Sequence, residues 1–310
     1  MTKFLVAGAT GLVGSAVLDK LNESGQAAVG ISSRDADLRN FGATLEVIKK
    51  YRPTCIIDAA AKVGGIKYNN DFPVEFLLDN LAIQNNLMQA AHQLDVEKFV
   101  FLGSSCIYPK FSAQPIREEY LMTGPLESTN SAYAMAKIAG IELIKSYRRQ
   151  YGRRWISLMP TNIFGPFDNF SEVTGHVIPA LITKFVRARE LQEDTVEVWG
   201  TGNARREFLF SQDLAESILF CADNYDNGEP LNIGTGKDLS IKELAELISK
   251  IVEFKGEIVF NHDYPDGTPR KLLDVSRVNC LGWKASTTLE DGLTTTIKWY
   301  LDQRREGLRL

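Results

Sequence analysis

The chain has 310 residues, of which 44% are hydrophobic and 24% are charged. These proportions match ordinary globular proteins and exclude a disordered, collagen-like or coiled-coil chain. The formal net charge is −4, whereas proteins that bind nucleic acids as their main role usually carry a basic excess, so we expect no nucleic-acid partner.

No apolar run approaches the roughly 18 residues that cross a bilayer, and the first residues lack the pattern of a signal peptide. We therefore expect no membrane partner and a cytoplasmic location. The four cysteines form no CxxC pair, which favours free thiols, and no spacing of His and Cys fits a zinc site. We expect no metal.

The first 160 residues alternate between strand-like and helix-like segments. In chain order we expect strands at 4–7, 27–31, 55–58, 99–102 and 155–158, and helices at 13–21, near 45–50, at 73–93 and at 132–151. This alternation predicts an α/β fold with a doubly wound parallel Rossmann sheet, whose ligand crevice lies beyond the carboxyl ends of the strands.

The pattern changes after about Pro160, where segments rich in Gly, Pro, Asn and Asp separate shorter elements. We expect a smaller C-terminal α/β domain that is interleaved with the larger one. The predicted nucleotide-binding domain comprises residues 1–164 and about 208–234, and the predicted substrate domain comprises about 165–207 and 235–310.

A glycine-rich turn stands between the first strand and the first helix. Glycine suits the tight turn, the close approach of a pyrophosphate and the packing of helix on strand, and the helix N-terminus offers free N–H groups to phosphates. The alternative is an ordinary strand–helix turn. We interpret the turn as a dinucleotide site made by Gly8, Thr10, Gly11, Leu12, Val13 and Gly14.

The end of the second strand indicates which dinucleotide binds. An acidic residue there would bind the ribose 2′-hydroxyl of NAD, and a cation would accommodate the 2′-phosphate of NADP. Ser32 and Ser33 are followed by Arg34, whose guanidinium suits a phosphate, and then by Asp35. This order favours NADP, and Asp35 leaves NAD as the alternative.

Tyr133 and Lys137 lie one helical turn apart on the same face of the helix predicted after the fourth strand. The lysine charge, together with an oxidised nicotinamide, would bring the tyrosine pKa toward neutral pH and fit the phenol for proton transfer. The spacing alone arises by chance in about one of two such chains. Ser104 and Ser105 at the end of the fourth strand strengthen the interpretation, because that end faces the crevice.

The glycine turn, Ser104 and the Tyr133/Lys137 pair resemble the extended short-chain dehydrogenase/reductases, which mostly act on nucleotide sugars. Within that superfamily the chain resembles the GDP-L-fucose synthase family from residue 4 to about residue 300. The similar segments are 101–110, 159–162, 165–166, 168–170, 176–181, 198–200, 206–208 and 265–274. The resemblance implies NADPH-dependent conversion of GDP-4-keto-6-deoxy-D-mannose to GDP-L-fucose by epimerisation at C3 and C5 and reduction at C4.

Epimerisation beside a ketone needs two groups that exchange protons on opposite faces of the sugar, and a thiol and an imidazole suit this task at neutral pH. Cys106 lies two residues beyond Ser104, so in an extended strand both side chains would point toward the crevice. The resemblance makes His176 its acid/base partner. We interpret Cys55, Cys221 and Cys280 as ordinary buried thiols and His92 and His262 as structural.

The resemblance also implies the remaining contacts and a homodimer built on helices 73–92 and 132–150. Asn162 would lie near the nicotinamide or the sugar, and Lys184 would be a substrate contact. Val177 and Leu181 would flank the base, and the sugar and diphosphate would be contacted by Trp199, Arg206 and Lys271. Arg205 is an alternative to its neighbour, and Trp199 would equally suit an interface. Thr10 stands where the family can have an arginine, which puts more weight on Arg34 for the 2′-phosphate.

Four alternatives remain open from the sequence. Related enzymes act on other GDP-4-keto-sugars of the colitose or deoxyheptose type. An NAD-dependent 4-epimerase would use the same fold but would not need Cys106 and His176. A 4,6-dehydratase would need acidic residues after Ser104, and none is present. A redox-sensing binding protein would not need Tyr133 and Lys137.

Overall fold

The computed structural model describes residues 2–264 and 266–306. Residue 1, in the predicted nucleotide-binding domain, and residues 265 and 307–310, in the predicted substrate domain, lie outside the described residues. A parallel six-stranded sheet has the strand order β2-β1-β3-β4-β5-β9. Its strands are β1 (Lys3–Ala7), β2 (Ala27–Ile31), β3 (Cys55–Asp58), β4 (Lys98–Leu102), β5 (Ile156–Pro160) and β9 (Leu231–Ile233).

The predicted α/β fold with a parallel Rossmann sheet is confirmed, and the first five strands lie where the sequence predicts them. Every residue of β3 and β5 is buried, which is typical of parallel strands that are covered on both faces by helices. The chain reaches β2 on one side of β1 and then crosses to β3 on the other side. The crevice predicted at this reversal therefore lies beyond the carboxyl ends of β1 and β3.

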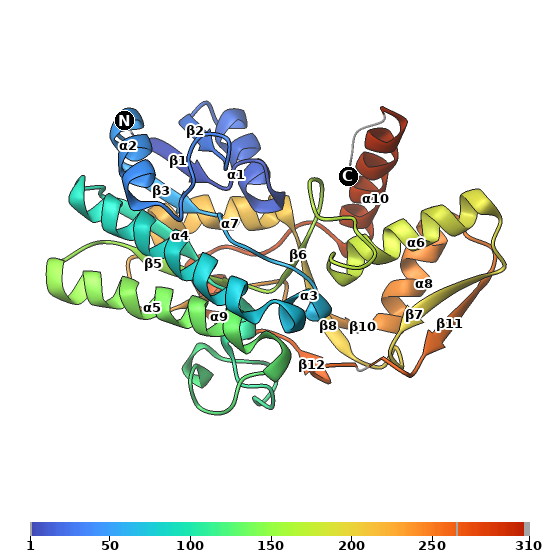
Figure 1. Ribbon diagram of the computed structural model, residues 1–310. Coiled ribbons are helices and arrows are strands. Elements are labelled where there is room, and N and C mark those ends of the chain that lie inside the picture. The colour runs from blue at the N-terminus through green and yellow to red at the C-terminus, as the bar shows by residue number, and fades with distance from the viewer. Residues whose placement is uncertain (1, 265, 307–310) are drawn as a thin grey trace.

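Helices cover both faces of this sheet. On one face α4 contacts both α2 and α5, and α4 and α5 run side by side along their length (Figure 1). On the other face α1 packs against α7. The bounds of these helices are α1 (Leu12–Glu23), α2 (Phe41–Tyr51), α4 (Pro73–Gln93), α5 (Ser131–Tyr151) and α7 (Ser211–Asn224). Pro73 occupies the first turn of α4, as predicted, where its missing N–H is not needed.

The second half of the molecule is built around the strand β8, which pairs with β6, β10 and β12, and around a separate parallel pair of β7 and β11. Helices α6, α8 and α10 pack together beside these strands (Figure 1). The strands are β6 (Asn162–Phe164), β7 (Thr195–Trp199), β8 (Arg205–Phe210), β10 (Asp238–Ser240), β11 (Glu257–Asn261) and β12 (Arg270–Lys271). The helices are α6 (Val177–Leu191), α8 (Ile241–Val252) and α10 (Leu289–Arg305).

Short helices complete the chain. They are α3 (Ile66–Asp71), α9 (Ser276–Leu281) and the 3-10 turns η1 (Ser105–Ile107), η2 (Glu118–Tyr120) and η3 (Ser128–Asn130). In the described ranges 2–264 and 266–306, no helix combines the length and the apolar character that crossing a membrane requires.

The buried side chains form two hydrophobic cores. The larger core lies around the six-stranded sheet, and the smaller core joins α6, α8 and α10 to β7 and β8. Leu273, Val275, Val278 and Trp283 belong to the larger core, although the sequence assigns their segment to the substrate domain. The segment that contains these four residues therefore packs on the larger half of the molecule. The predicted domain boundaries remain a proposal.

Candidate active site

The glycine turn leaves a cradle beside the N-terminus of α1. Gly8 has a φ of +77°, and a Cβ on it would lie 2.6 Å from the carbonyl oxygen of Ala59. A Cβ on Gly14 would lie 2.1 Å from the carbonyl oxygen of Gly8. Gly11 caps α1 without a side chain, and the first helical turn has no acidic residue. The uncovered N–H groups and the helix dipole therefore fit a pyrophosphate.

Arg34 and Asp35, which follow β2, have different surroundings in the structure. The carboxylate of Asp35 accepts the backbone N–H of Ser32 at 2.8 Å and its hydroxyl at 2.9 Å, and these bonds lower the pKa of Asp35. Asp35 thus closes its own turn. Arg34 is exposed, and within the described ranges no carboxylate pairs with it. The guanidinium is available for a 2′-phosphate.

Tyr133 and Lys137 lie on the face of α5 that points to the end of β4. The Lys137 ammonium is buried, donates to the carbonyl of Leu102 at 2.9 Å and lies 5.9 Å from the centroid of the Tyr133 ring. Burial lowers the pKa of Lys137, and Asp58 opposes this effect. Burial raises the pKa of Tyr133, and a hydrogen bond with Ser104 opposes the rise. In the protein alone, Lys137 does not bring the phenol pKa toward neutral pH as predicted.

Asp58 is a candidate residue that the sequence analysis missed. It ends β3 with only 1% of its surface exposed, and its Oδ1 accepts the N–H of Ala60 at 3.2 Å while its Oδ2 has no partner in the described part of the chain. Burial raises the pKa of Asp58 to about 6, although the charge of Lys137 lowers it. A carboxylate at the end of an otherwise apolar strand was the available signal.

The prediction that Cys106 lies in an extended strand is wrong. The strand ends at Leu102, and residues 105–107 form the 3-10 turn η1 rather than an extended strand. The Ser104 side chain causes this turn because its oxygen accepts the backbone N–H of Cys106 at 3.2 Å. The direction of the Cys106 side chain therefore does not follow from the alternation of side chains along a strand.

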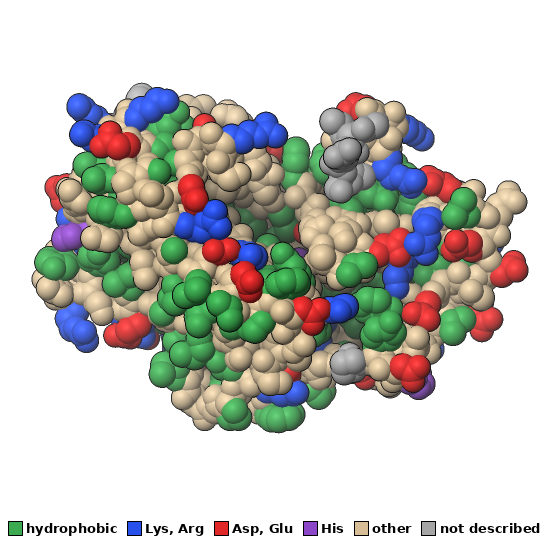
Figure 2. Space-filling model, viewed as in Figure 1, with side chains coloured by type: hydrophobic (Ala, Val, Ile, Leu, Met, Phe, Trp, Pro, Cys, Tyr) green, Lys and Arg blue, Asp and Glu red, His purple; other side chains and the backbone are tan. Residues whose placement is uncertain are grey.

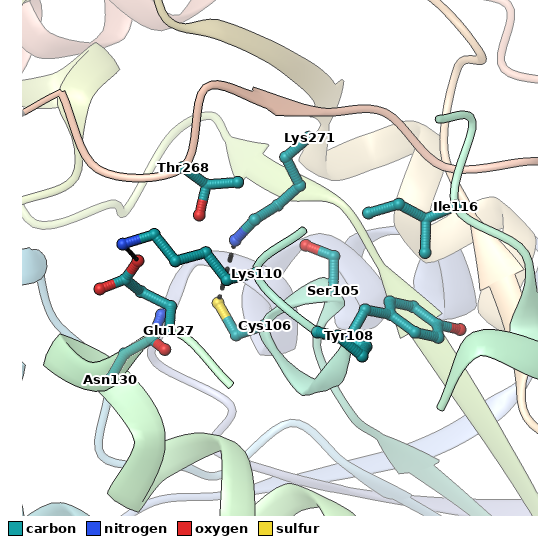
Figure 3. Close-up of a pocket in the computed structure, with 10 residues that line it drawn as sticks. Ser105, Cys106, Tyr108, Lys110, Ile116, Glu127, Asn130, Thr268 and Lys271 are labelled. Carbon is teal, nitrogen blue, oxygen red and sulfur yellow. Dashed lines mark hydrogen bonds and ion pairs between the residues drawn. The ribbon is translucent and has the colours of Figure 1, made fainter. Parts of the chain in front are cut away.

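A lysine holds the thiol in a small pocket. The Lys271 ammonium lies 3.5 Å from the Cys106 sulfur, and the ion pair of Lys110 and Glu127 lies beside them (Figure 3). Burial raises the pKa of Cys106, but Lys271, Ser104 and His176 together lower it by more, so the thiol pKa lies below its ordinary value.

His176 stands at the N-terminus of α6, where it caps the helix without a side-chain hydrogen bond. Its side chain remains 46% exposed, and its Nδ1 lies 3.9 Å from Oδ1 of Asp168. Desolvation lowers the pKa of His176, but Asp168 and Cys106 raise it by more. Each of Cys106 and His176 thus favours the charged form of the other.

Arg206 rather than Arg205 is directed toward this cleft. The Arg205 guanidinium is paired with Asp238 at 3.2 Å and with Glu243 at 3.4 Å. Arg206 instead donates to the carbonyl of Asp266 at 3.1 Å, and its burial lowers its pKa while the charge of Cys106 raises it. The pairing of β12 with β8 sets Arg206 opposite Lys271. The two cations predicted for the diphosphate are therefore neighbours.

An open groove of about 310 Å³ runs beside Trp199. The Trp199 ring stacks on Tyr264 with a centroid distance of 4.4 Å and an interplanar angle of 8°. The Lys184 ammonium lies 4.8 Å from the Trp199 centroid and donates to the carbonyl of Glu197 at 2.9 Å. Tyr264, which sequence reasoning missed, thus forms one aromatic face of the groove.

Three of the residues predicted to contact the substrate or the cofactor are at least partly taken up by contacts within the protein. Leu181 is 4% exposed and packs in the smaller core, which leaves little of its surface for a base. Val177 is half-buried at the first turn of α6. Asn162 donates its side-chain amide to the carbonyl of Glu207 at 2.7 Å, so this group ties β6 to β8. The described residues contain no cluster of three His, Cys, Asp or Glu that could hold a metal ion.

Comparisons with known proteins agree with this geometry. Residues 4–234 match the model of the NAD dependent epimerase/dehydratase family. The chain is 47% identical to a putative GDP-L-fucose synthase 2 of Arabidopsis thaliana, covering 97% of this chain and 92% of that protein. It is 45% identical to the GDP-L-fucose synthase of Escherichia coli, with 97% of each covered.

A solved structure supports the same relationship. The crystal structure of a GDP-L-fucose synthetase from Naegleria fowleri bound to NADP matches with a TM-score of 0.91 at 32% identity, covering 100% of this chain and 98% of that one. Together with the glycine cradle at α1 and the Ser104, Tyr133 and Lys137 cluster, these similarities show that the chain belongs to the NAD dependent epimerase/dehydratase family and, within it, to the GDP-L-fucose synthase group.

Proposed function

We propose that the protein converts GDP-4-keto-6-deoxy-D-mannose to GDP-L-fucose by C3 and C5 epimerisation followed by NADPH-dependent reduction at C4. The observation that carries this proposal is the mutual electrostatic effect of Cys106, whose sulfur lies 3.5 Å from the Lys271 ammonium, and His176, together with the interaction of Tyr133 with Ser104 and Cys106. A simple reductase has no use for the pair of Cys106 and His176, and an enzyme that only epimerises C3 and C5 has no use for a nicotinamide site.

The epimerisation follows from the acidity of hydrogens beside a ketone. Ser104 and Tyr133 hydrogen-bond the C4 oxygen and stabilise the enolate that forms when a neighbouring carbon loses its proton. Cys106 and His176 then exchange protons with that carbon from opposite faces of the ring. The lowered pKa of Cys106 and the raised pKa of His176 bring both groups toward neutral pH, where each is able to gain or lose a proton.

The reduction uses the same oxygen. Bound NADPH supplies a hydride to C4. Tyr133 delivers the proton that the C4 oxygen then needs, and Ser104 hydrogen-bonds that oxygen. The buried Lys137 ammonium is held at the end of β4 by its hydrogen bond to Leu102. NADP is held by Arg34, Asn162, Lys137 and the turn of Gly8, Thr10, Gly11, Leu12, Val13 and Gly14. The cradle and the free Arg34 support this assignment.

The GDP portion extends into the smaller half of the molecule. Arg206 and Lys271 face the diphosphate as neighbouring cations on paired strands. Lys184 and Trp199 border the open groove. Val177 and Leu181, which we assign to the base, lie on α6, the helix that carries Lys184.

A related GDP-4-keto-sugar of the colitose or deoxyheptose type is the second candidate substrate. The groove beside Trp199 is open, so the shape of the site does not by itself restrict the sugar. An NAD-dependent 4-epimerase would not need Cys106 and His176, whereas in this protein the two groups interact electrostatically.

The protein is also proposed to be a cytoplasmic homodimer. Val74 and Leu78 on α4 are 62% and 60% exposed, and Met135 on α5 is 50% exposed. These side chains give the paired helices apolar outer surface, which is visible in Figure 2, and a second copy would cover it as a four-helix bundle. Sedimentation of a monomer at micromolar concentration would contradict this part of the proposal.

The deciding experiment is incubation with GDP-4-keto-6-deoxy-D-mannose and either NADPH or NADH, followed by identification of the sugar formed. We expect GDP-L-fucose, formed faster with NADPH. The same incubation in heavy water with Cys106→Ser should give no deuterium at C3 and C5. The prediction of a buried Cys280 is wrong, because this thiol is exposed on α9, and Cys280→Ser should exchange normally. Full exchange in Cys106→Ser would remove the thiol from the mechanism.

A further inference from the structure

A buried carboxylate faces His176 from the loop that joins β6 to α6. The side chain of Asp168 is 5% exposed, and its Oδ1 accepts the backbone N–H of Asn169 at 2.7 Å. Its Oδ2 is buried and has no hydrogen-bond partner in the described ranges. The Nδ1 of His176 lies 3.9 Å from Oδ1. A buried carboxylate is costly without a nearby cation, and His176 is placed to supply one.

The loop fixes the separation of the two groups. The Asn169 side-chain amide donates to the Thr174 hydroxyl at 3.0 Å, which closes the loop just before His176. A Cβ on Gly175 would lie 2.3 Å from the carbonyl oxygen of Asn169, so the loop is closed more tightly than any other residue would allow. Asp168 therefore stays against the imidazole as part of a fixed turn.

The position of His176 explains why a carboxylate is needed. The positive end of a helix dipole disfavours a cation, and His176 is the N-cap residue of α6. The charged groups that favour the imidazolium are Asp168 from the loop and Cys106 from η1. Of these two residues, only Asp168 has no role in the mechanism proposed above.

We propose that Asp168 is a positioning residue for His176, orienting the imidazole with Nδ1–H toward Oδ1 and leaving Nε2 free to face the cleft that contains Cys106. A neutral imidazole has two tautomers, and a carboxylate beside Nδ1 selects the one that carries its proton there. Nε2 is then the atom that exchanges protons with the sugar. The inference rests on the proposed function, because it is there that His176 has its proton-transfer role.

Nuclear magnetic resonance of the ligand-free protein tests the inference without substrate or cofactor. The chain has only three histidines, so the spectrum of protein with labelled histidine is simple, and His176→Gln assigns the signal. Asp168→Asn should lower the pKa of His176 and mix its tautomers. Asp168→Glu, which restores the charge, should keep the pKa raised. Glu246→Gln removes an exposed carboxylate of α8 and should change neither property.

Exchange kinetics provide the second readout. Asp168→Asn should slow deuterium exchange at C3 and C5 by about tenfold or more, leave the Kd for NADPH unchanged, and move the His176 limb of the pH profile to lower pH. An unchanged His176 pKa and tautomer in folded Asp168→Asn would overturn the inference. If Asp168→Asn does not fold, the same measurements on Asp168→Ser decide it. Absence of exchange in the unmodified enzyme would instead refute the proposed function, whatever the His176 titration shows.

Discussion

The ammonium of Lys271 lies 3.5 Å from the sulfur of Cys106, although the two residues are 165 positions apart in the chain. The contact arises because β12 pairs with β8 and returns the chain to the end of β4. It couples the proposed diphosphate-binding residue to the proposed proton-transfer thiol. A cation at this distance stabilises a thiolate.

Replacing Lys271 with Met should therefore raise the pKa of the Cys106 thiol. The reason is that burial of the thiol raises this pKa, whereas the Lys271 charge is the largest of the effects that lower it. We expect slower alkylation of Cys106 by iodoacetamide at pH 7, with the rate falling about tenfold for each unit by which the pKa rises. The measurement is the alkylation rate against pH, followed by mass spectrometry in a Cys280→Ser background.

Lys110→Met is the matched control for this measurement. Lys110 borders the same pocket (Figure 3), but Glu127 at 2.7 Å already compensates its charge. The control should leave the alkylation profile of Cys106 nearly unchanged. Equal effects of the two substitutions would show that general loss of positive charge, rather than the Lys271 contact, sets the reactivity of the thiol.

Local patterns predicted the larger half of the molecule well and the site less completely. The runs of β3 and β5 are buried along their whole length and mostly apolar, because both faces of a parallel sheet are covered. The glycines of the β1–α1 turn indicate a close backbone approach. Both signals lie within a few consecutive residues. The fold and the cofactor turn follow from them.

The remainder of the site depends on contacts that no short segment reveals. The turn at Cys106 is set by a hydrogen bond from the backbone to Ser104, which competes with strand geometry. Asp58 and Asp168 gain their importance only from burial beside Lys137 and His176. A carboxylate in a sequence does not show whether it will be buried, so these positions were not predicted.

The buried carboxyl of Asp58 should make stability depend on pH. Its pKa is raised from 3.8 to about 6 in the folded protein, so its contribution is fully present below about pH 4 and is lost as the pH rises through about 6. The loss corresponds to about 3 kcal/mol, from about 1.4 kcal/mol per pKa unit. Asp58→Asn should lack this decline. Urea unfolding of both proteins between pH 4 and pH 7 measures it, and parallel curves would contradict the prediction.

Tyr133→Phe should separate the two reactions. Loss of the phenolic proton donor should slow C4 reduction by about 10²- to 10⁴-fold, while Cys106 and His176 still exchange protons at C3 and C5. NADPH consumption reports the first reaction, and deuterium incorporation from heavy water reports the second. The exchange rate in the same sample controls for folding and substrate binding. A normal rate of NADPH consumption would remove Tyr133 from the reduction step.

Arg34→Ala should weaken the binding of NADPH far more than that of NADH. Asp35 is held by Ser32, and within the described residues no carboxylate forms an ion pair with Arg34, so the guanidinium is available to meet the 2′-phosphate. Charge-assisted hydrogen bonds contribute about 1.5–3 kcal/mol, which predicts a Kd for NADPH about 10- to 100-fold higher. Fluorescence titration with each dinucleotide measures the two constants.

Arg39→Ala is the control for the dinucleotide measurement, since it removes the same charge a few residues away. Arg39 is paired with Asp37 at 2.9 Å and with Asp79 at 3.5 Å, so its guanidinium is already compensated. Because these carboxylates hold it, Arg39→Ala should leave the preference between NADPH and NADH nearly unchanged. If Arg34→Ala and Arg39→Ala weakened NADPH binding equally, the 2′-phosphate would be recognised by the overall charge of this surface, and Arg34 would lose its assigned role.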